Sequence, residues 1–130
     1  PAHADFYTAS LQEEITARLI EIGLAEGKRY LPQRLVKWAE ATGLQYERVR
    51  VRHMVSRWGS CSAKNHISLN SALVFLPLPL IDYVLLHELV HTLHKNHGAS
   101  FWSALEKRMP DAKMRRRELR KHPIMSTSRQ

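Results

Sequence analysis

Apolar residues repeat along the chain first at a helical spacing and then, from about residue 45, at the two-residue spacing of a strand. The early repeat follows one helix face through Leu11, Ile15, Leu19 and Ile22. It predicts a helix over residues 5–26 that stops at Gly27. Pro32 suits the first turn of a second helix, which the pattern continues to Gly43. We expect both helices to be structural scaffold.

The strand pattern spans residues 45–54, where apolar and charged residues alternate in part. The small residues of the stretch 56–62 then predict a turn. Residues 64–65 make a hairpin-like break, and residues 66–70 predict a second short strand. We expect these strands to form a small antiparallel sheet.

A third pattern, over residues 80–93, has almost no polar face. Its apolar positions are Leu80, Ile81, Val84, Leu85, Leu86, Leu89, Val90 and Leu93. A helix that is apolar nearly all round belongs in the interior of a protein, and Pro79 lies where proline favours a first helical turn. Two more helices are predicted after it, one capped by Ser100 and one running from Asp111 to about Lys121.

These elements together predict an α+β fold: two N-terminal helices, a small antiparallel sheet, the buried helix and two C-terminal helices. The chain has 130 residues, of which 44% are hydrophobic. That is enough for the core of one domain over residues 1–125, followed by a polar tail at 126–130 that we expect to fray.

From the sequence we expect neither a membrane span nor a signal peptide at the first residues. No run approaches the ~18 consecutive apolar residues that indicate a membrane span, and the first residues lack the basic and apolar blocks of a signal peptide. A single cysteine, Cys61, cannot form an internal disulfide, which suits a reducing compartment. We therefore expect a cytoplasmic protein and, because no methionine begins the chain, a processed or excised fragment.

The buried helix contains the stretch His87-Glu88-Leu89-Val90-His91. Residues four apart share a helix face, so His87 and His91 can direct both imidazoles at one metal ion. Glu88 lies about 100° round the helix, where its carboxylate can reach a zinc-bound water without binding the metal. This arrangement is typical of zinc hydrolases that use the Glu as general base. The alternatives are a surface histidine cluster or a core helix with satisfied histidines, and the core helix would have to bury an unpaired Glu at a high cost.

A catalytic zinc site has three protein ligands and an open fourth position. His97, six residues after His91, is the first candidate for the third ligand, provided that the chain turns at Lys95 and Asn96. Downstream carboxylates are the other candidates, with Glu106 ahead of Glu118.

Two other potential ligands are expected to have supporting roles. His94 shares the helix face of His87, but it would stand about 10 Å farther along the axis. We expect it to line the site or to support a ligand. Cys61 is expected to be a small buried residue, because a thiolate beside three imidazoles would change the class of the site.

The formal net charge of +8 is concentrated near the C-terminus. From Glu106 onward there are nine basic and three acidic residues, which leaves a net charge of +6. Most of it comes from the basic C-terminal block, Lys113, Arg115, Arg116, Arg117, Arg120 and Lys121. Such a block can bind nucleic acid or another polyanion. The absence of interleaved aromatic residues favours instead a solvated helix face.

Several motifs occur in order between roughly residues 30 and 120. They are Arg57-Trp58-Gly59-Ser60-Cys61, Ile67-Ser68-Leu69-Asn70, Pro79, Ile81-Asp82-Tyr83-Val84, the His-Glu-x-x-His stretch with His97 after it, and Phe101-Trp102. The set resembles the YgjP-like (DUF45) metallopeptidases, which are related to the M48 and SprT-like zincins. The resemblance implies a minimal zincin-like fold, zinc held by His87, His91 and His97, and Glu88 as catalytic acid/base. Family members usually carry a further N-terminal, largely β region that this sequence lacks, which affects substrate recognition more than chemistry.

The resulting prediction is a zinc metallopeptidase that cleaves peptides or proteins, with Zn2+ as cofactor. Zinc polarises a bound water, Glu88 takes its proton, and the nucleophile attacks the substrate carbonyl. The developing oxyanion needs a second electrophile, for which Arg57, Tyr83 and His66 are candidates. Tyr83 lies one helical turn before His87. Arg57 carries a fixed charge, but it can equally anchor its own turn by hydrogen bonds to backbone carbonyls.

Two other functions would keep the metal. A nucleotide phosphohydrolase is favoured by the basic charge, but the sequence has no Gly-rich phosphate loop and no carboxylate cluster for magnesium. A non-catalytic, zinc-stabilised nucleic-acid-binding module would bind through the basic C-terminal block, and Glu88 would then have no catalytic role. The aromatic residues Trp58, Phe101 and Trp102 are expected in the core rather than on a substrate platform.

Overall fold

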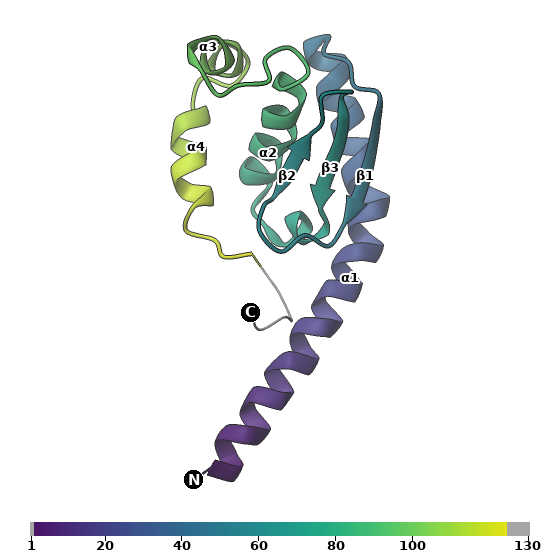
Figure 1. Ribbon diagram of the computed structural model, residues 1–130, viewed down its shortest axis with the longest axis vertical. Coiled ribbons are helices and arrows are strands. Elements are labelled where there is room, and N and C mark those ends of the chain that lie inside the picture. The colour runs from purple at the N-terminus through teal and green to yellow at the C-terminus, as the bar shows by residue number, and fades with distance from the viewer. Residues whose placement is uncertain (1, 125–130) are drawn as a thin grey trace.

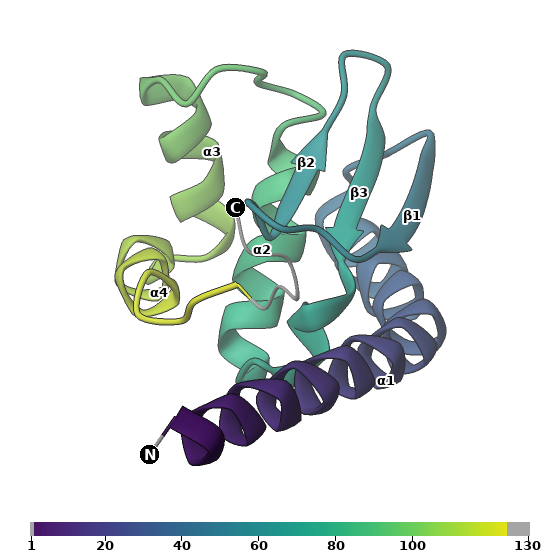
Figure 2. The same ribbon diagram turned by 60° about the horizontal axis from the view of Figure 1, so that its bottom comes forward.

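Helix α2 (Leu78–Val90), which ends within the His-Glu-x-x-His stretch and has His91 as its C-cap, lies in the middle of the fold. The computed structural model describes residues 2–124, with side chains from residue 8 onward. α2 separates a three-stranded sheet from the helices α3 (Ala99–Arg108) and α4 (Ala112–Leu119) (Figures 1 and 2). Ten of its 13 residues are buried, as the apolar pattern predicts. The polar tail predicted at 126–130 lies outside the described residues.

The sheet contains β1 (Arg48–Arg52), β2 (Gly59–Cys61) and β3 (His66–Asn70), in the order β1-β3-β2. β2 and β3 pair antiparallel, whereas β1 and β3 pair parallel. The α+β class is confirmed, but the prediction of an antiparallel sheet is wrong for the second pair. The cause is β2, which lies in the stretch predicted as a turn and reverses the chain once more. Its glycine, serine and cysteine have no strong strand preference.

The turn between β2 and β3 is the predicted hairpin-like break. Asn65 has a φ of 62°, the left-handed conformation that asparagine tolerates better than most residues. The hydroxyl of Ser62 accepts hydrogen bonds from the N–H groups of Lys64 (3.3 Å) and His66 (3.1 Å). These bonds hold the turn and fix the register of β3.

The two faces of the sheet differ in polarity. Ile67 and Leu69 of β3 are fully buried against the helices, and Val51 of β1 is paired with Leu69 on the same face. The opposite face of β1 carries exposed arginines at positions 48, 50 and 52. This alternation is what a strand with one solvated face requires.

Helix α1 (Ala2–Thr42) is a single helix of 41 residues, where the sequence predicted two. Gly27 does not end it. A Cβ on Gly27 would lie 3.1 Å from Cγ1 of Val51 and 3.3 Å from Cα of Ser71. The glycine therefore permits close packing of α1 on β1 and on the short 3-10 helix η1 (Ser71–Phe75).

Pro32 lies inside α1 without ending it. A proline within a helix removes one backbone hydrogen bond and crowds the preceding turn. Leu31 and Leu35 flank it and are both fully buried. Their burial holds this part of α1 against the core, which outweighs the local preference for a break.

The first half of α1 projects beyond the rest of the fold (Figure 1). The predicted apolar stripe is largely exposed there, with 56% of Leu11, 50% of Ile15 and 45% of Ile22 accessible. These side chains lie outside the described core, so the stripe does not mark a buried helix face here. Helix α1 is long, but no helix of the described chain is both long enough and apolar enough to cross a membrane.

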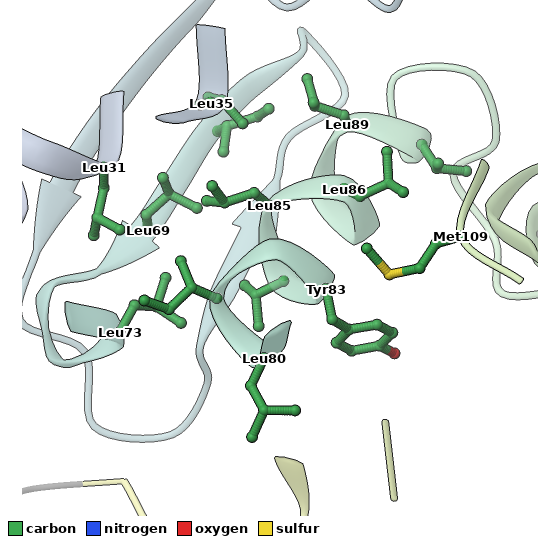
Figure 3. Close-up of a cluster of buried hydrophobic side chains, with 14 of the residues drawn as sticks. Leu31, Leu35, Leu69, Leu73, Leu80, Tyr83, Leu85, Leu86, Leu89 and Met109 are labelled. Carbon is green, nitrogen blue, oxygen red and sulfur yellow. The ribbon is translucent and has the colours of Figure 1, made fainter. Parts of the chain in front are cut away.

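The hydrophobic core lies on both sides of α2 (Figure 3). Leu85 lies on the sheet side, together with Leu69 of β3, whereas Leu86 lies on the side of Met109, which follows α3. Burial on two sides explains why the helix has almost no polar face.

A buried carboxylate ties α1 to α2. Asp82, only 7% exposed, accepts hydrogen bonds from Nε and Nη2 of Arg34 at 2.9 and 2.8 Å and from Nε1 of Trp38 at 2.9 Å. Three donors satisfy the charge of Asp82. The contact fixes the orientation of α2, and with it the direction of the histidines at its far end.

Candidate active site

Three histidines converge at the C-terminal end of α2. One ring nitrogen of each of His87, His91 and His97 lies within 4.8 Å of the others. His87 lies in the last turn of α2, His91 is its C-cap, and His97 comes from the connection to α3. The structure thus brings together the three residues predicted as metal ligands. Their binding of zinc stays a prediction.

Helix α2 ends several residues before the predicted turn at Lys95 and Asn96. α2 ends at Val90, and the N–H groups of Thr92 and Leu93 donate to the carbonyls of Leu89 and Val90 at 3.0 and 2.9 Å. These three-residue bonds tighten the last turn. The chain does bend at Lys95 and Asn96, but in the described part of the chain Asn65 is the one non-glycine residue with a positive φ, so Asn96 does not have the left-handed conformation that asparagine often adopts at a helix end.

Hydrogen bonding leaves a lone pair of His91 available. Its Nδ1–H donates to the backbone carbonyl of His94 at 2.9 Å, so the lone pair of the neutral ring is on Nε2. That nitrogen lies 2.9 Å from Nε2 of His97. Two ring nitrogens approach this closely only when one of them carries a proton that it donates to the other or when a cation lies between them. His94 therefore supports a predicted ligand, through its main chain rather than its ring.

Burial favours the neutral form of these rings. It lowers the pKa of His91 and, with help from the nearby charges of His87 and Arg116, also that of His97. Neutral imidazole is the form that binds metal. The donor set of three imidazoles suits a divalent transition metal such as zinc.

Phe101 forms the floor of the histidine cluster. It is fully buried, and its ring centroid lies 5.0, 4.5 and 5.0 Å from those of His87, His91 and His97. The sequence predicted a core residue here, which is confirmed, but not its contact with all three rings. The first turn of α3 places it there, four residues after His97.

Glu88 is buried beside the cluster and is not one of the three clustered groups. Its Oε2 lies 3.1 Å from Nδ1 of His87. On its other side is the backbone of β2, where a Cβ on Gly59 would lie 3.1 Å from Cγ and Oε2 of Glu88. The carboxylate is therefore held between α2 and the edge strand.

Two cavities meet at His87 and Glu88. One has a volume of about 290 Å³ and is also lined by Tyr83. The other, of about 390 Å³, extends to His91 and His97. Arg57 lines both, so an extended ligand could cross the cluster with Arg57 beside it.

Arg57 belongs to a loop that is fixed by Asn70. The fully buried Asn70 donates from Nδ2 to the backbone carbonyls of Met54 (2.9 Å) and Arg57 (3.0 Å), and its Oδ1 accepts from the N–H of Ala72 (3.0 Å). Within the described residues the guanidinium of Arg57 forms no hydrogen bond or ion pair. It therefore does not anchor its own turn, which was the alternative role. Asn70 is a supporting residue that the sequence analysis missed.

Tyr83 lies one turn before His87 on α2, with its ring centroid 5.7 Å from that of the histidine. Burial raises the pKa of Tyr83 to about 12, against the opposing charges of Arg116 and Arg120. The phenol therefore keeps its proton at neutral pH and can donate a hydrogen bond into the smaller cavity.

The remaining candidates lie elsewhere. His66 lines a different cavity, on the outer face of the sheet with Arg48 and Arg50, because it alternates with the inward-facing Ile67. Glu106 is not in the cluster, and its Oε1 lies 3.8 Å from Nζ of Lys113.

Cys61 is half-buried at the end of β2, with its Sγ 3.9 Å from Nζ of Lys95. Burial raises the pKa of its thiol, which disfavours the thiolate that a metal would need. It lies outside the group of potential metal ligands.

Comparison with known proteins gives a consistent picture. The YgjP-like metallopeptidase domain matches residues 3–122. The crystal structure of the metallopeptidase zymogen abylysin of Pyrococcus abyssi is similar, with a TM-score of 0.59 and 30% identity over 71% of this chain and 95% of that one. The zymogen jannalysin of Methanocaldococcus jannaschii has the same fold, with a TM-score of 0.58 and 20% identity over 67% and 90% of the two chains. No curated protein sequence matches the chain.

The domain match spans α1, apart from its first residue, and every later element through α4, and with them the histidine cluster, Glu88 and Arg57. Abylysin, the more similar of the two solved structures, is a metallopeptidase zymogen, and the alignment with this chain covers 95% of its length. This chain belongs to the YgjP-like metallopeptidase-domain family.

Proposed function

We propose that the chain is a zinc-dependent peptidase whose metal is held by His87, His91 and His97. The observation that supports this most directly is the convergence of three imidazole nitrogens within 4.8 Å, next to a buried carboxylate. Zinc at this position would supply a Lewis acid that polarises a carbonyl and lowers the pKa of a water molecule. Membership of a metallopeptidase family supports a peptide or protein as the substrate.

Glu88 is the general base in this proposal. Its carboxylate borders both cavities, so it can reach a water molecule and a substrate held between them. It accepts the proton of the attacking water and returns it to the leaving amine. Its contacts with His87 and with the backbone at Gly59 restrict its position, which a proton-transferring group needs.

Arg57 and Tyr83 are the proposed stabilisers of the oxyanion. Both line the smaller cavity beside Glu88. Arg57 has a charge with no partner in the described chain, and Tyr83 keeps its proton because its pKa is raised to about 12. A preorganised donor of this kind typically contributes about 100- to 1,000-fold to the rate.

The test is the variant Glu88→Gln, measured for zinc content and for hydrolysis of an unstructured protein. It keeps the size of the side chain but removes the proton-accepting charge. We expect about one zinc per chain, and a loss of hydrolysis of about 100- to 10,000-fold or more. Glu40→Gln, at an exposed position of α1, is the control. Full activity in Glu88→Gln would disprove the role of Glu88.

The same variants separate this proposal from the two other functions. Nucleoside triphosphates are offered in a parallel assay. Nucleotide turnover that depends on Glu88, without peptide cleavage, would identify a phosphohydrolase instead. Zinc-loaded wild type that hydrolyses neither substrate but binds nucleic acid would indicate the non-catalytic module.

A further inference from the structure

The two cavities beside Glu88 are lined by positive charge. Arg116 and Arg120 line the smaller one and Lys95 the larger one, in addition to Arg57 at their junction. Glu88 is the only acidic residue among the described residues that line either cavity. A substrate that enters here therefore meets four cations and one buried carboxylate.

The basic C-terminal block is divided by the fold into two parts. Three of its members have acidic neighbours: Lys113 with Glu106, Arg115 with Asp111, and Lys121 with Glu118. Arg116 and Arg120 have none within 4.0 Å in the described chain. Arg117 has none either, but of the six residues of the block only Arg116 and Arg120 line the cavity.

Arg116 and Arg120 have fixed positions on one side of α4. They lie four residues apart, Arg116 within the helix and Arg120 at its C-cap, so both project from the same face. The guanidinium of Arg116 lies 5.3 Å from the ring centroid of Trp102, a cation–π contact that restricts its motion. α4 packs against α2, which keeps this face turned toward the site.

Lys95 is placed in a similar way at the larger cavity. Its Nζ donates to the backbone carbonyl of Ser62 at 2.9 Å and to the side-chain oxygen of Asn65. These partners are neutral, so they position the ammonium group without cancelling its charge.

Like charges gathered in one cleft repel each other, and the single carboxylate of Glu88 offsets only part of the charge of the four cations. A carboxylate on the substrate would do so, since a guanidinium pairs with a carboxylate through two parallel hydrogen bonds. We propose that the enzyme selects peptides with an acidic side chain next to the scissile bond, which Arg116 and Arg120 bind in the smaller cavity. A second acidic side chain, on the other side of the bond, meets Lys95. This inference rests on the proposed peptidase function.

Matched peptides test the selection. The peptides are identical except for Glu, Gln or Lys at one position on either side of the cleaved bond, and kcat/KM is measured for each. We expect wild type to prefer Glu over Gln by about 10- to 100-fold. In Arg116→Gln/Arg120→Gln this ratio should collapse toward one. Arg117→Gln, on the same helix but outside the cavity, should keep the wild-type ratio.

A binding measurement distinguishes failure of this inference from failure of the proposed function. Fluorescence anisotropy with the Glu88→Gln protein reports affinity without hydrolysis. Tighter binding of the Glu peptide, lost in the double variant, supports the acidic subsite even if wild type cleaves no peptide, in which case only the proposed function fails. Equal binding of Glu and Gln peptides overturns the inference. Heparin or RNA binding that the double variant loses, with peptide selection unchanged, also overturns it and assigns the two arginines to a polyanion.

Discussion

Gly59 of β2 packs directly on Glu88 of α2. A Cβ added at Gly59 would lie 3.1 Å from both Cγ and Oε2 of the glutamate, and 3.3 Å from the backbone oxygen of Ser68. Of these neighbours, the glutamate side chain can move more easily than the sheet backbone. A methyl group at this position therefore displaces the proposed general base.

The first prediction concerns Gly59→Ala. We expect kcat to fall by about 10- to 100-fold, because Glu88 shifts relative to the substrate, while the zinc content stays unchanged. Gly98→Ala is the matched control, since a Cβ on Gly98 meets no atom within 4 Å and its φ of −84° suits any residue. Steady-state kinetics and metal analysis of both variants test this. Equal kcat in the two variants would contradict the proposed placement of Glu88.

The second prediction concerns the floor of the cluster. Phe101→Leu removes the ring that contacts all three histidines but keeps an apolar side chain. We expect zinc affinity to fall by about 10- to 100-fold, as for other groups that orient metal ligands. Competition with a chelator measures it. Phe75→Leu, at a 45% exposed aromatic residue of η1, should bind zinc like wild type.

The third prediction ranks the candidates for the third ligand. His97→Ala should lose zinc at chelator concentrations that leave wild type loaded, because a site with two protein ligands no longer has the usual three. Glu106→Ala should retain zinc, since its carboxylate lies by Lys113 and not in the cluster. The reverse order in a zinc titration would exclude the proposed ligand set.

The fourth prediction concerns the tie between α1 and α2. Asp82→Asn leaves Arg34 without its carboxylate, and Asp82 is nearly buried. We expect the free energy of unfolding in urea to fall by about 3 kcal/mol. Glu21→Gln, in an exposed pair with Arg18, should change it by less than about 0.5 kcal/mol. A similar effect of both substitutions would show that the buried pair contributes no more than the exposed one.

The sequence predicted helix α2 best because two independent signals agree there. Residues such as Leu85 and Leu86 bury opposite sides of α2, and the pair His87 and His91 has the spacing of a shared face. The similarity to YgjP-like metallopeptidases, seen in ordered motifs, is confirmed by the domain match over residues 3–122. Where the local pattern and the tertiary packing agree, the sequence is sufficient to predict the element and its clustered histidines.

The errors occur where packing overrides local preference. In the sequence Gly27 resembles a residue that ends a helix. In the structure it lies within α1, where a glycine fits because a side chain would crowd β1. Pro32 resembles a helix start, but the burial of Leu31 and Leu35 keeps α1 continuous. β2 escaped prediction because an edge strand of small residues has no apolar alternation.

Contacts between distant segments could not be predicted from spacing. No local pattern indicates that Phe101 lies beneath three histidines, or that Asn70 holds the loop of Arg57. The same is true of Arg116 and Arg120, which look like part of a uniform basic face until α4 is placed beside α2.

The protruding half of α1 implies that the protein has two parts that differ in local stability, the protruding segment and the packed domain. Residues 8–22 have helical hydrogen bonds but almost no buried side chains, and such a segment can unwind without disturbing the core. From Gly23 onward the helix is packed against the sheet side of the domain. Amide hydrogens of the first segment should therefore exchange with solvent quickly and independently of zinc. Those near Leu31 and Leu35 should exchange only when the whole domain unfolds, and should slow further when zinc is bound.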